Sequence, residues 1–288
     1  MKEKFKVLIA GGDMRQLYCA YRLASEADVY ITGFDDELIP HDTIVKKADL
    51  SASDFFDCAV LPVPPLSDIK TISTPCSKTA LLPSEIKGTL KKNAFVFAGR
   101  TDDRLTEIFN GFQICDYMKR EELSLKNAIP TAEGAVQIAL EELPVTLNGL
   151  KVLIVGTGRI GSCLAEILKG FGSDVTTAVH NAKGSAKARI LGVKSVCSAS
   201  MDTDYSLVFN TVPDLVFDRS LLSRFDTKTL FIDLASKPGG IDFESASQLG
   251  IKVIWALGLP GKTAPVTAGE FIAETISCVL SERSDRNG

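Results

Sequence analysis

The chain has 288 residues, of which 45% are hydrophobic and 24% are charged, so it is long enough for two domains with separate cores. Its formal net charge of −4 offers no basic surface for nucleic acid, and no apolar run is long enough to cross a bilayer. The seven cysteines are scattered without a C-x-x-C pair, so we expect neither a disulfide framework nor a metal site. The N-terminus lacks the apolar core of a secretion signal, which favours a cytoplasmic protein.

In the first half of the chain, short apolar segments alternate with helical patterns, and they predict strands at 6–10, 29–33, 58–63, 94–98 and 112–115. A glycine turn, Gly11-Gly12-Asp13, follows the first strand, but its spacing departs from the dinucleotide fingerprint. Arg15, at the start of the next helix, is a candidate contact for the carboxylate of a small ligand. The alternative is that the glycines only turn the chain and Asp13 caps the helix.

The second half repeats the alternation, with strands predicted at 152–155, 175–179, 195–197, 207–210, 230–233 and 253–256. A helix predicted at 131–143, after Pro130, links the halves, and another at 266–280 closes the chain. This pattern predicts an α/β protein with two doubly wound parallel-sheet, Rossmann-like domains flanking a cleft. The first domain would comprise residues 1–130, completed by a C-terminal helix at 265–288, and the second would comprise residues 131–264 with the linking helix.

A dinucleotide fingerprint opens the second domain. The motif Gly156-Thr157-Gly158-Arg159-Ile160-Gly161 directly follows an apolar strand and precedes a helix predicted at 162–169. In this context Gly156 permits the tight turn, Gly158 lets the pyrophosphate approach, and Gly161 lets the helix pack on the strand. The pyrophosphate would bind the N-terminal N–H groups of that helix, so the sequence predicts a nicotinamide dinucleotide site.

The end of the next strand indicates which dinucleotide binds. An NAD enzyme carries an acidic residue about 20 residues after the first glycine, but this chain has His180 and Asn181 there. Lys183, Lys187 and Arg189 follow, which favours the 2′-phosphate of NADP(H), while NAD(H) and ordinary surface charges remain the alternatives. Further cofactor contacts are expected from the segment after the strand at 207–210, namely Asn210, Thr211, Val212 and Pro213.

Cations at the predicted carboxyl ends of strands are candidates for substrate binding, because ligands of parallel α/β sheets bind there. Arg100, Lys237 and Lys262, together with Arg15 and Thr263, would bind an anionic substrate in the cleft. Each of these cations taken alone is equally compatible with an exposed surface charge.

Candidates for proton transfer do not include a histidine pair. His41 and His180 are the sole histidines, which argues against a histidine-based hydride-transfer site. Glu133, Asp233 and Lys237 are therefore the candidate catalytic residues. Capping and helix-dipole roles explain the two acids equally well.

Four motifs together resemble the family of dipicolinate synthase A subunits, over nearly the whole chain. They are Gly11-Gly12-Asp13-x-Arg15-Gln16, Asn127-x-x-Pro130-Thr131-Ala132-Glu133-Gly134-Ala135, Asp233-Leu234-Ala235-Ser236-Lys237-Pro238-Gly239-Gly240 and Leu259-Pro260-Gly261-Lys262-Thr263-Ala264-Pro265. The resemblance implies an NAD(P)-dependent dehydrogenase in the mother cell of a spore-forming bacterium, acting with a flavoprotein-like B subunit. It implies the synthesis of dipicolinic acid from 4-hydroxy-tetrahydrodipicolinate, and it transfers no assigned catalytic residue.

The implied chemistry is an aromatisation. Loss of water from the hydroxylated ring leaves a dihydropyridine dicarboxylate, and removal of a hydride and a proton yields the pyridine. Such a reaction needs a bound nicotinamide and a clamp for two carboxylates more than a strong base. Two alternatives remain open, another two-domain NAD(P)-dependent amino or hydroxy acid dehydrogenase and a non-catalytic nucleotide-sensing subunit. We also expect the chain to self-associate.

Overall fold

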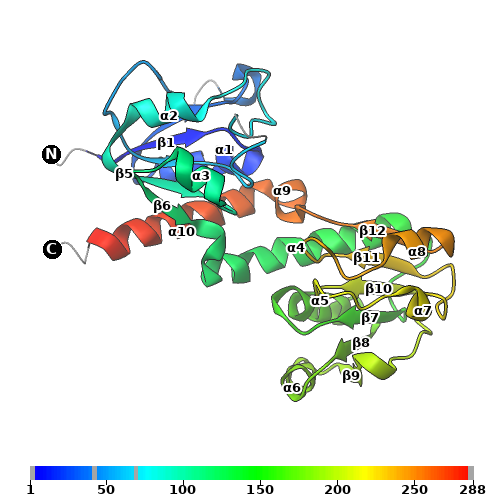
Figure 1. The fold of residues 1–288 in the computed structure, drawn as a ribbon. Helices are drawn as coiled ribbons and strands as arrows, with labels where there is room; N and C mark the ends of the chain where they lie inside the picture. Colours follow the sequence, from blue (N-terminus) through cyan, green and yellow to red (C-terminus); the bar gives the residue numbers. More distant parts are fainter. Residues whose placement is uncertain (1–3, 41–43, 68–70, 285–288) are drawn as a thin grey trace. The chain divides into compact units, whose positions relative to one another are not determined.

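The structure, a computed structural model, describes residues 4–40, 44–67 and 71–284. The chain forms two compact units, Met1–Asn127 with Ala264–Gly288, and Ala128–Thr263 (Figure 1). His41, one of the two histidines considered above, lies outside the described residues. Among the described helices, none combines the length and the hydropathy needed to cross a membrane.

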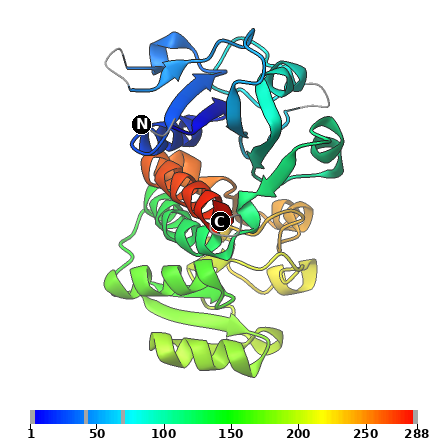
Figure 2. The same ribbon diagram turned by 90° about the vertical axis from the view of Figure 1, so that its left-hand side faces the viewer.

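The first unit contains a parallel six-stranded sheet in the order β3-β2-β1-β4-β5-β6. Alternate residues of the central strand β1 serve the two faces of this sheet. Val7 and Ile9 pack with helices α1 and α10, whereas Leu8 and Ala10 pack with α2 and α3. The last helix of the chain, α10, thus lies against the first helix (Figure 2). The elements are β1 Lys6–Ala10, α1 Met14–Leu23, β2 Asp28–Thr32, η1 Asp36–Leu38, β3 Lys46–Lys47, β4 Phe56–Val60, α2 Pro83–Thr89, β5 Leu90–Ala98, α3 Asp103–Ile108, β6 Gln113–Asp116, η2 Tyr117–Lys119 and α10 Pro265–Ser284.

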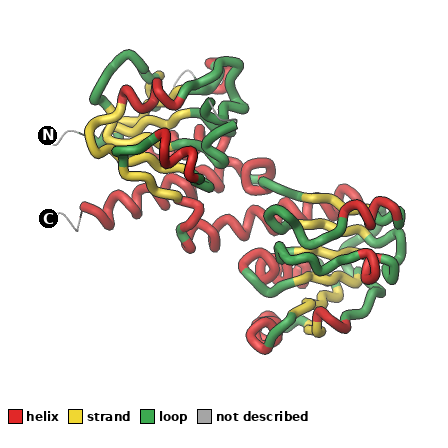
Figure 3. Tube along the Cα trace, viewed as in Figure 1, coloured by secondary structure: helices red, strands yellow, loops and turns green. Residues whose placement is uncertain are grey.

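The second unit contains another parallel six-stranded sheet, in the order β12-β11-β10-β7-β8-β9. Val152 and Ile154 of β7 pack with helices α4, α5 and α9, and Leu153 and Val155 pack with α7 and α8. Strands and helices alternate along the chain in both units (Figure 3). Helix α4, Glu121–Glu142, begins in the first unit and continues into the second from Ala128. The other elements of the second unit are β7 Lys151–Val155, α5 Arg159–Gly170, β8 Asp174–Val179, α6 Ala182–Leu191, β9 Lys194–Cys197, η3 Ser198–Ser200, β10 Leu207–Asn210, α7 Arg219–Leu222, β11 Leu230–Asp233, α8 Phe243–Gln248, β12 Lys252–Trp255 and α9 Leu259–Thr263.

The predicted fold class, two doubly wound parallel sheets, is confirmed. The predicted start of the linking helix is wrong, because α4 begins at Glu121 and continues through Pro130. A proline inside a helix removes one backbone hydrogen bond and costs about 3 kcal/mol. Ala128 before Pro130 and Ala132 after it are both buried, so burial on both sides of the proline holds the helix together. The two-residue strand β3 is absent from the prediction because its exposed lysines show no apolar pattern.

Candidate functional site

The turn from β7 into α5 has the geometry of a dinucleotide-binding loop. Gly156 adopts a φ of +96°, and a Cβ atom there would lie 2.7 Å from Thr211 Oγ1. A Cβ atom on Gly161 would collide with the carbonyl oxygen of Gly156, so only glycine lets α5 pack this closely on the turn. A Cβ atom on Gly158, in contrast, would have no heavy atom of the described residues within 4 Å. The turn therefore has no room for a side chain at Gly156 or Gly161, whereas the space beside Gly158 is open, as pyrophosphate binding requires.

The N-terminus of α5 lies on the same turn and has no side-chain cap. Gly158 is its N-cap residue, so no side chain caps this helix, and its first turn carries no acidic residue. The first N–H groups of a helix have no acceptor within the helix and carry part of the positive end of its dipole. The backbone at Ile160 and Gly161, in the first turn of α5, therefore presents donors suited to an anion.

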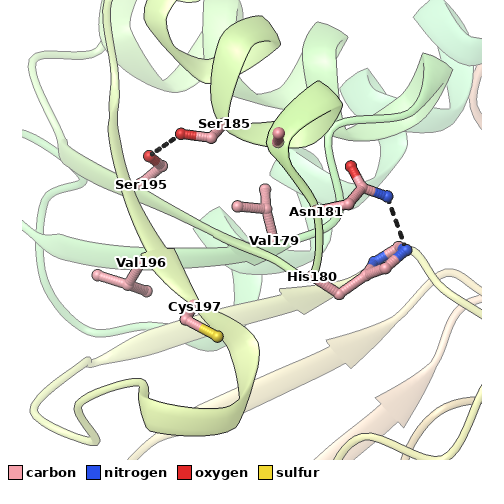
Figure 4. A pocket seen from close by; sticks show the side chains of 8 residues that line it. Val179, His180, Asn181, Ser185, Ser195, Val196 and Cys197 are labelled. Carbon is pink, nitrogen blue, oxygen red and sulfur yellow. Dashed lines mark hydrogen bonds between the residues drawn. The ribbon is translucent and has the colours of Figure 1, made fainter.

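A pocket lies beyond the carboxyl ends of β8 and β9 (Figure 4). Asn181 caps α6, since its Oδ1 accepts a hydrogen bond from Gly184 N at 2.8 Å. The other end of this side chain, Nδ2, lies 2.9 Å from His180 Nε2. Thr157 is buried beneath the same region, so the pocket adjoins the glycine turn. The lining residues are Val179, His180, Asn181, Ala182, Ser185, Ser195, Val196 and Cys197, and these eight described residues include no carboxylate.

Lys187 connects α6 to the glycine turn. Its side chain is exposed, and its Nζ donates a hydrogen bond to the carbonyl oxygen of Thr157 at 3.3 Å. Lys183, the predicted phosphate contact, lies one helical turn earlier, is exposed, and makes no hydrogen bond or ion pair with the described residues. The sequence indicated a group of cations in this region, but only the structure shows which ammonium reaches the turn.

Asn210 and Asp233 form a buried polar pair at the carboxyl ends of β10 and β11, where they lie side by side in the sheet. Asn210 Nδ2 donates to Asp233 Oδ1 at 2.8 Å and to the carbonyl oxygen of Val212 at 2.8 Å. The Asp233 carboxylate also accepts from Ala235 N at 3.0 Å and from Gly240 N at 2.9 Å. With three N–H donors engaged, Asp233 holds its loop in shape. This arrangement favours a positioning role over the predicted proton transfer.

The remaining cofactor candidates follow Asn210. Thr211 donates its hydroxyl to the carbonyl oxygen of Val155 at 2.7 Å, and Val212 lies against Gly156. Pro213 is exposed at the next position. The segment after β10 is thus packed against the glycine turn.

The candidate substrate cations of the second unit are exposed. Lys237 lies in the loop after β11, next to a cis peptide bond with Pro238, and Lys262 lies in α9. Neither ammonium forms a hydrogen bond or ion pair with the described residues, so both are available to an anion. Thr263 contacts α4, because a Cβ atom on Gly134 would collide with its hydroxyl.

Glu133 lies inside α4, which begins at Glu121, and its side chain is exposed. The alternative of a capping or first-turn role for Glu133 is therefore wrong, because a cap must lie at the helix end. The prediction failed because α4 begins at Glu121 and continues through Pro130, which places Glu133 in the middle of the helix.

In the first unit, Asp13 is the N-cap residue of α1 and accepts from Arg15 N at 3.0 Å. Its carboxylate also binds the Arg15 guanidinium, with Nη2 to Oδ2 at 2.8 Å. Burial lowers the pKa of Arg15, but the hydrogen bond and charge of Asp13 outweigh burial and raise it above its usual value. Arg100 has an exposed side chain and a φ of +59°, and Asp116 accepts hydrogen bonds from its backbone N–H and from that of Thr101.

The described residues contain no group of three or more His, Cys, Asp and Glu side chains placed to hold a metal ion. Burial raises the pKa of the Cys19 and Cys58 thiols, which makes them packing residues with little thiolate character.

Comparison with known proteins places this geometry in a family. Residues 6–118 match the model of the N-terminal domain of the dipicolinate synthase A subunit, and residues 129–235 match that of the D-isomer specific 2-hydroxyacid dehydrogenase NAD-binding domain. The second match supports a nicotinamide dinucleotide as the cofactor of an oxidoreductase-type fold.

Relatives that match nearly the whole chain support the same family. The dipicolinate synthase A subunit of Bacillus subtilis is 30% identical over 292 residues, covering 98% of both chains. The crystal structure of this synthase's A chain from Bacillus subtilis superposes with a TM-score of 0.88 at 29% identity, covering 99% of both chains. That of the A subunit from Bacillus halodurans gives a TM-score of 0.88 at 29% identity, covering 97% of this chain and 99% of the other. The chain therefore belongs to the family of dipicolinate synthase A subunits.

Proposed function

We propose that this chain is the dehydrogenase subunit of a dipicolinate synthase. It oxidises dihydrodipicolinate, formed by loss of water from 4-hydroxy-tetrahydrodipicolinate, to dipicolinate with NADP⁺, in the mother cell of a sporulating bacterium. The observation that carries this proposal is the glycine turn at Gly156–Gly161, open at Gly158, in a chain that matches a member of this family over 98% of both chains. The family name of a multi-subunit synthase supports a partner, which we propose is a flavoprotein-like B subunit, in addition to self-association.

The residues of the turn fit the cofactor. The uncapped N-terminus of α5 would hold the pyrophosphate, and the bound nicotinamide would accept the hydride that leaves the ring. On this chain, Lys187 and His180 would contact the adenosine ribose, and the segment after β10 would complete the site.

NADP(H) is favoured over NAD(H) by the charge at the ribose edge. No carboxylate lines the pocket at the end of β8, so the usual partner of a free 2′-hydroxyl is missing from these described residues. The Lys187 ammonium lies at the carbonyl oxygen of Thr157, one residue before Gly158. A 2′-phosphate that reached this ammonium would gain a charge-assisted hydrogen bond. We propose Lys187, rather than Lys183, as the principal phosphate contact.

The substrate would be held by its two carboxylates. Lys237, Lys262 and Thr263 of the second unit, and Arg15 and Arg100 of the first, are the proposed contacts. The ring proton passes to water or to the exposed Glu133, because aromatisation makes a strong base unnecessary.

An absorbance assay tests the proposal. Purified chain is mixed with NADP⁺ and 4-hydroxy-tetrahydrodipicolinate, with and without the B subunit, and the reduced nicotinamide and pyridine bands are followed. We expect both bands to rise together. A pyridine band that rises without nicotinamide reduction would overturn the dehydrogenase role.

Cofactor choice is tested with Lys187→Ser, with Lys183→Ser as the matched control from the same helix. Loss of one charge-assisted hydrogen bond of about 1.5–3 kcal/mol should weaken NADP⁺ binding roughly ten- to a hundredfold. NAD⁺ binding should be unchanged, and the Lys183 variant should resemble the wild type. Tighter binding of NAD⁺ than of NADP⁺ by the wild type would contradict the preference.

A further inference from the structure

A buried polar chain lies at the point where the strand order of the first sheet reverses, between β1 and β4. Open α/β sheets bind ligands at such a switch point, beyond the carboxyl ends of the strands. Three residues that follow different strands meet there. Gln16 follows β1 in helix α1, Leu61 follows β4, and Tyr117 follows β6. The hydrogen bonds that join these three residues take no part in the cofactor site of the second unit.

The hydrogen bonds among Gln16, Tyr117 and Leu61 fix the orientation of the Gln16 amide. The Tyr117 hydroxyl donates to the Leu61 carbonyl oxygen at 2.8 Å, so its single proton is committed. The Tyr117 oxygen can then only accept, and Gln16 Nε2 donates to it at 3.4 Å. The opposite orientation of the amide would set two acceptors against each other.

Gln16 Oε1 is left as an acceptor without a partner. Gln16 is 0% exposed, and this oxygen receives no hydrogen bond from the residues that the structure describes. It lies at the Gly11-Gly12 turn after β1, because a Cβ atom on Gly12 would be 2.6 Å from it. An unsatisfied buried acceptor costs about 1–3 kcal/mol, so the few that folded proteins retain call for an explanation, of which a bound ligand is one.

Arg15 adds a cation with unused donors, and its charge acts on Tyr117, the residue to which Gln16 is hydrogen-bonded. Its Nε and Nη2 bind Asp13 at 2.9 Å and 2.8 Å. A guanidinium carries five N–H groups, so the edge formed by Nη1 and the second Nη2 hydrogen remains for a bidentate carboxylate. The side chain is 13% exposed, so Asp13 holds it in place without closing it off.

We propose that Gln16 Oε1 accepts a hydrogen bond from the ring N–H of the dihydropyridine dicarboxylate in its 1,2-dihydro tautomer, and that Arg15 binds the adjacent carboxylate. The proposal rests on the function proposed above and makes Gln16 a specificity-determining residue. Oxidation would transfer the hydride from ring carbon C2 to the nicotinamide of NADP⁺ and release the proton of this nitrogen to water, and the product pyridine has no N–H. The product therefore leaves Gln16 Oε1 unpartnered again and binds more weakly than the substrate.

Two stable ligands that differ at this nitrogen test the idea by calorimetric titration of the full chain with NADP⁺. Piperidine-2,6-dicarboxylate carries N–H donors, and pyridine-2,6-dicarboxylate does not. We expect the wild type to bind the piperidine at least roughly tenfold more tightly, as for one hydrogen bond of about 1.4 kcal/mol. Gln16→Met, which keeps the side-chain length but removes the acceptor, should abolish this preference.

Tyr117→Phe is the matched control, because it breaks the same buried chain but keeps Gln16 Oε1. It should retain the preference, and a loss of preference in both variants would indicate a structural effect and overturn the proposal. The wild-type comparison needs no variant to fold. Equal binding of the two ligands by the wild type would overturn the role of Gln16 while supporting the dicarboxylate site. Failure of both ligands to bind would also contradict the proposed function.

Discussion

Asp233→Asn tests whether the buried carboxylate after β11 shapes its loop or transfers a proton. Its Oδ2 accepts from Gly240 N, whereas Oδ1 accepts from both Asn210 and Ala235. An asparagine must place its NH₂ group at one of these positions, and the Oδ2 position faces one donor instead of two. The variant then loses one charge-assisted hydrogen bond and leaves the Gly240 N–H buried without an acceptor. We expect the free energy of unfolding of the second unit to fall by about 2–4 kcal/mol.

Trp255 provides a local probe for this measurement. It is the single tryptophan of the sequence, and its Nε1 donates to the Ala235 carbonyl oxygen at 3.0 Å, in the loop that Asp233 holds. Urea unfolding followed by tryptophan fluorescence should therefore report the second unit. Asp242→Asn is the control, because Asp242 is the N-cap residue of α8, where asparagine is as good as aspartate.

The control should change the unfolding free energy by less than about 0.5 kcal/mol. An unchanged urea midpoint for Asp233→Asn, combined with a collapse of the dehydrogenase rate, would refute the positioning role. It would instead support proton transfer by Asp233.

Four further substitutions test the cofactor turn and the substrate cations. Gly158→Asp should abolish NADP⁺ binding in a calorimetric titration without unfolding the chain, because its side chain enters open space but repels the pyrophosphate; retained affinity would place the cofactor elsewhere. Gly161→Ala should lower the melting temperature of the second unit, since its Cβ collides with the Gly156 carbonyl oxygen. Lys237→Met and Lys262→Met should each lower kcat/KM about ten- to a hundredfold at saturating NADP⁺. Unchanged rates for both would remove these lysines from the carboxylate clamp.

The sequence by itself determined the two parallel sheets and the place of the dinucleotide turn. Both depend on local patterns. Continuous apolar strands alternate with helices, and Gly156 needs a backbone conformation, with φ at +96°, that other residues rarely adopt. Gly161 is required for close packing within the same short segment. Each of these sequence patterns lies within a few neighbouring residues, so it can be recognised without the tertiary structure.

Tertiary structure decided the features that depend on residues far apart in the chain. Helix α4 passes through Pro130 because apolar residues on both sides of it are buried, which local propensity cannot show. Lys187 rather than Lys183 reaches the glycine turn through the packing of α6 beside it. The same holds for Gln16 and Tyr117, separated by 101 residues, because only the sheet order brings β1 and β6 to one polar chain. A hydrogen bond between distant segments leaves no periodic trace in either one, so its partners become visible only when the chain is folded.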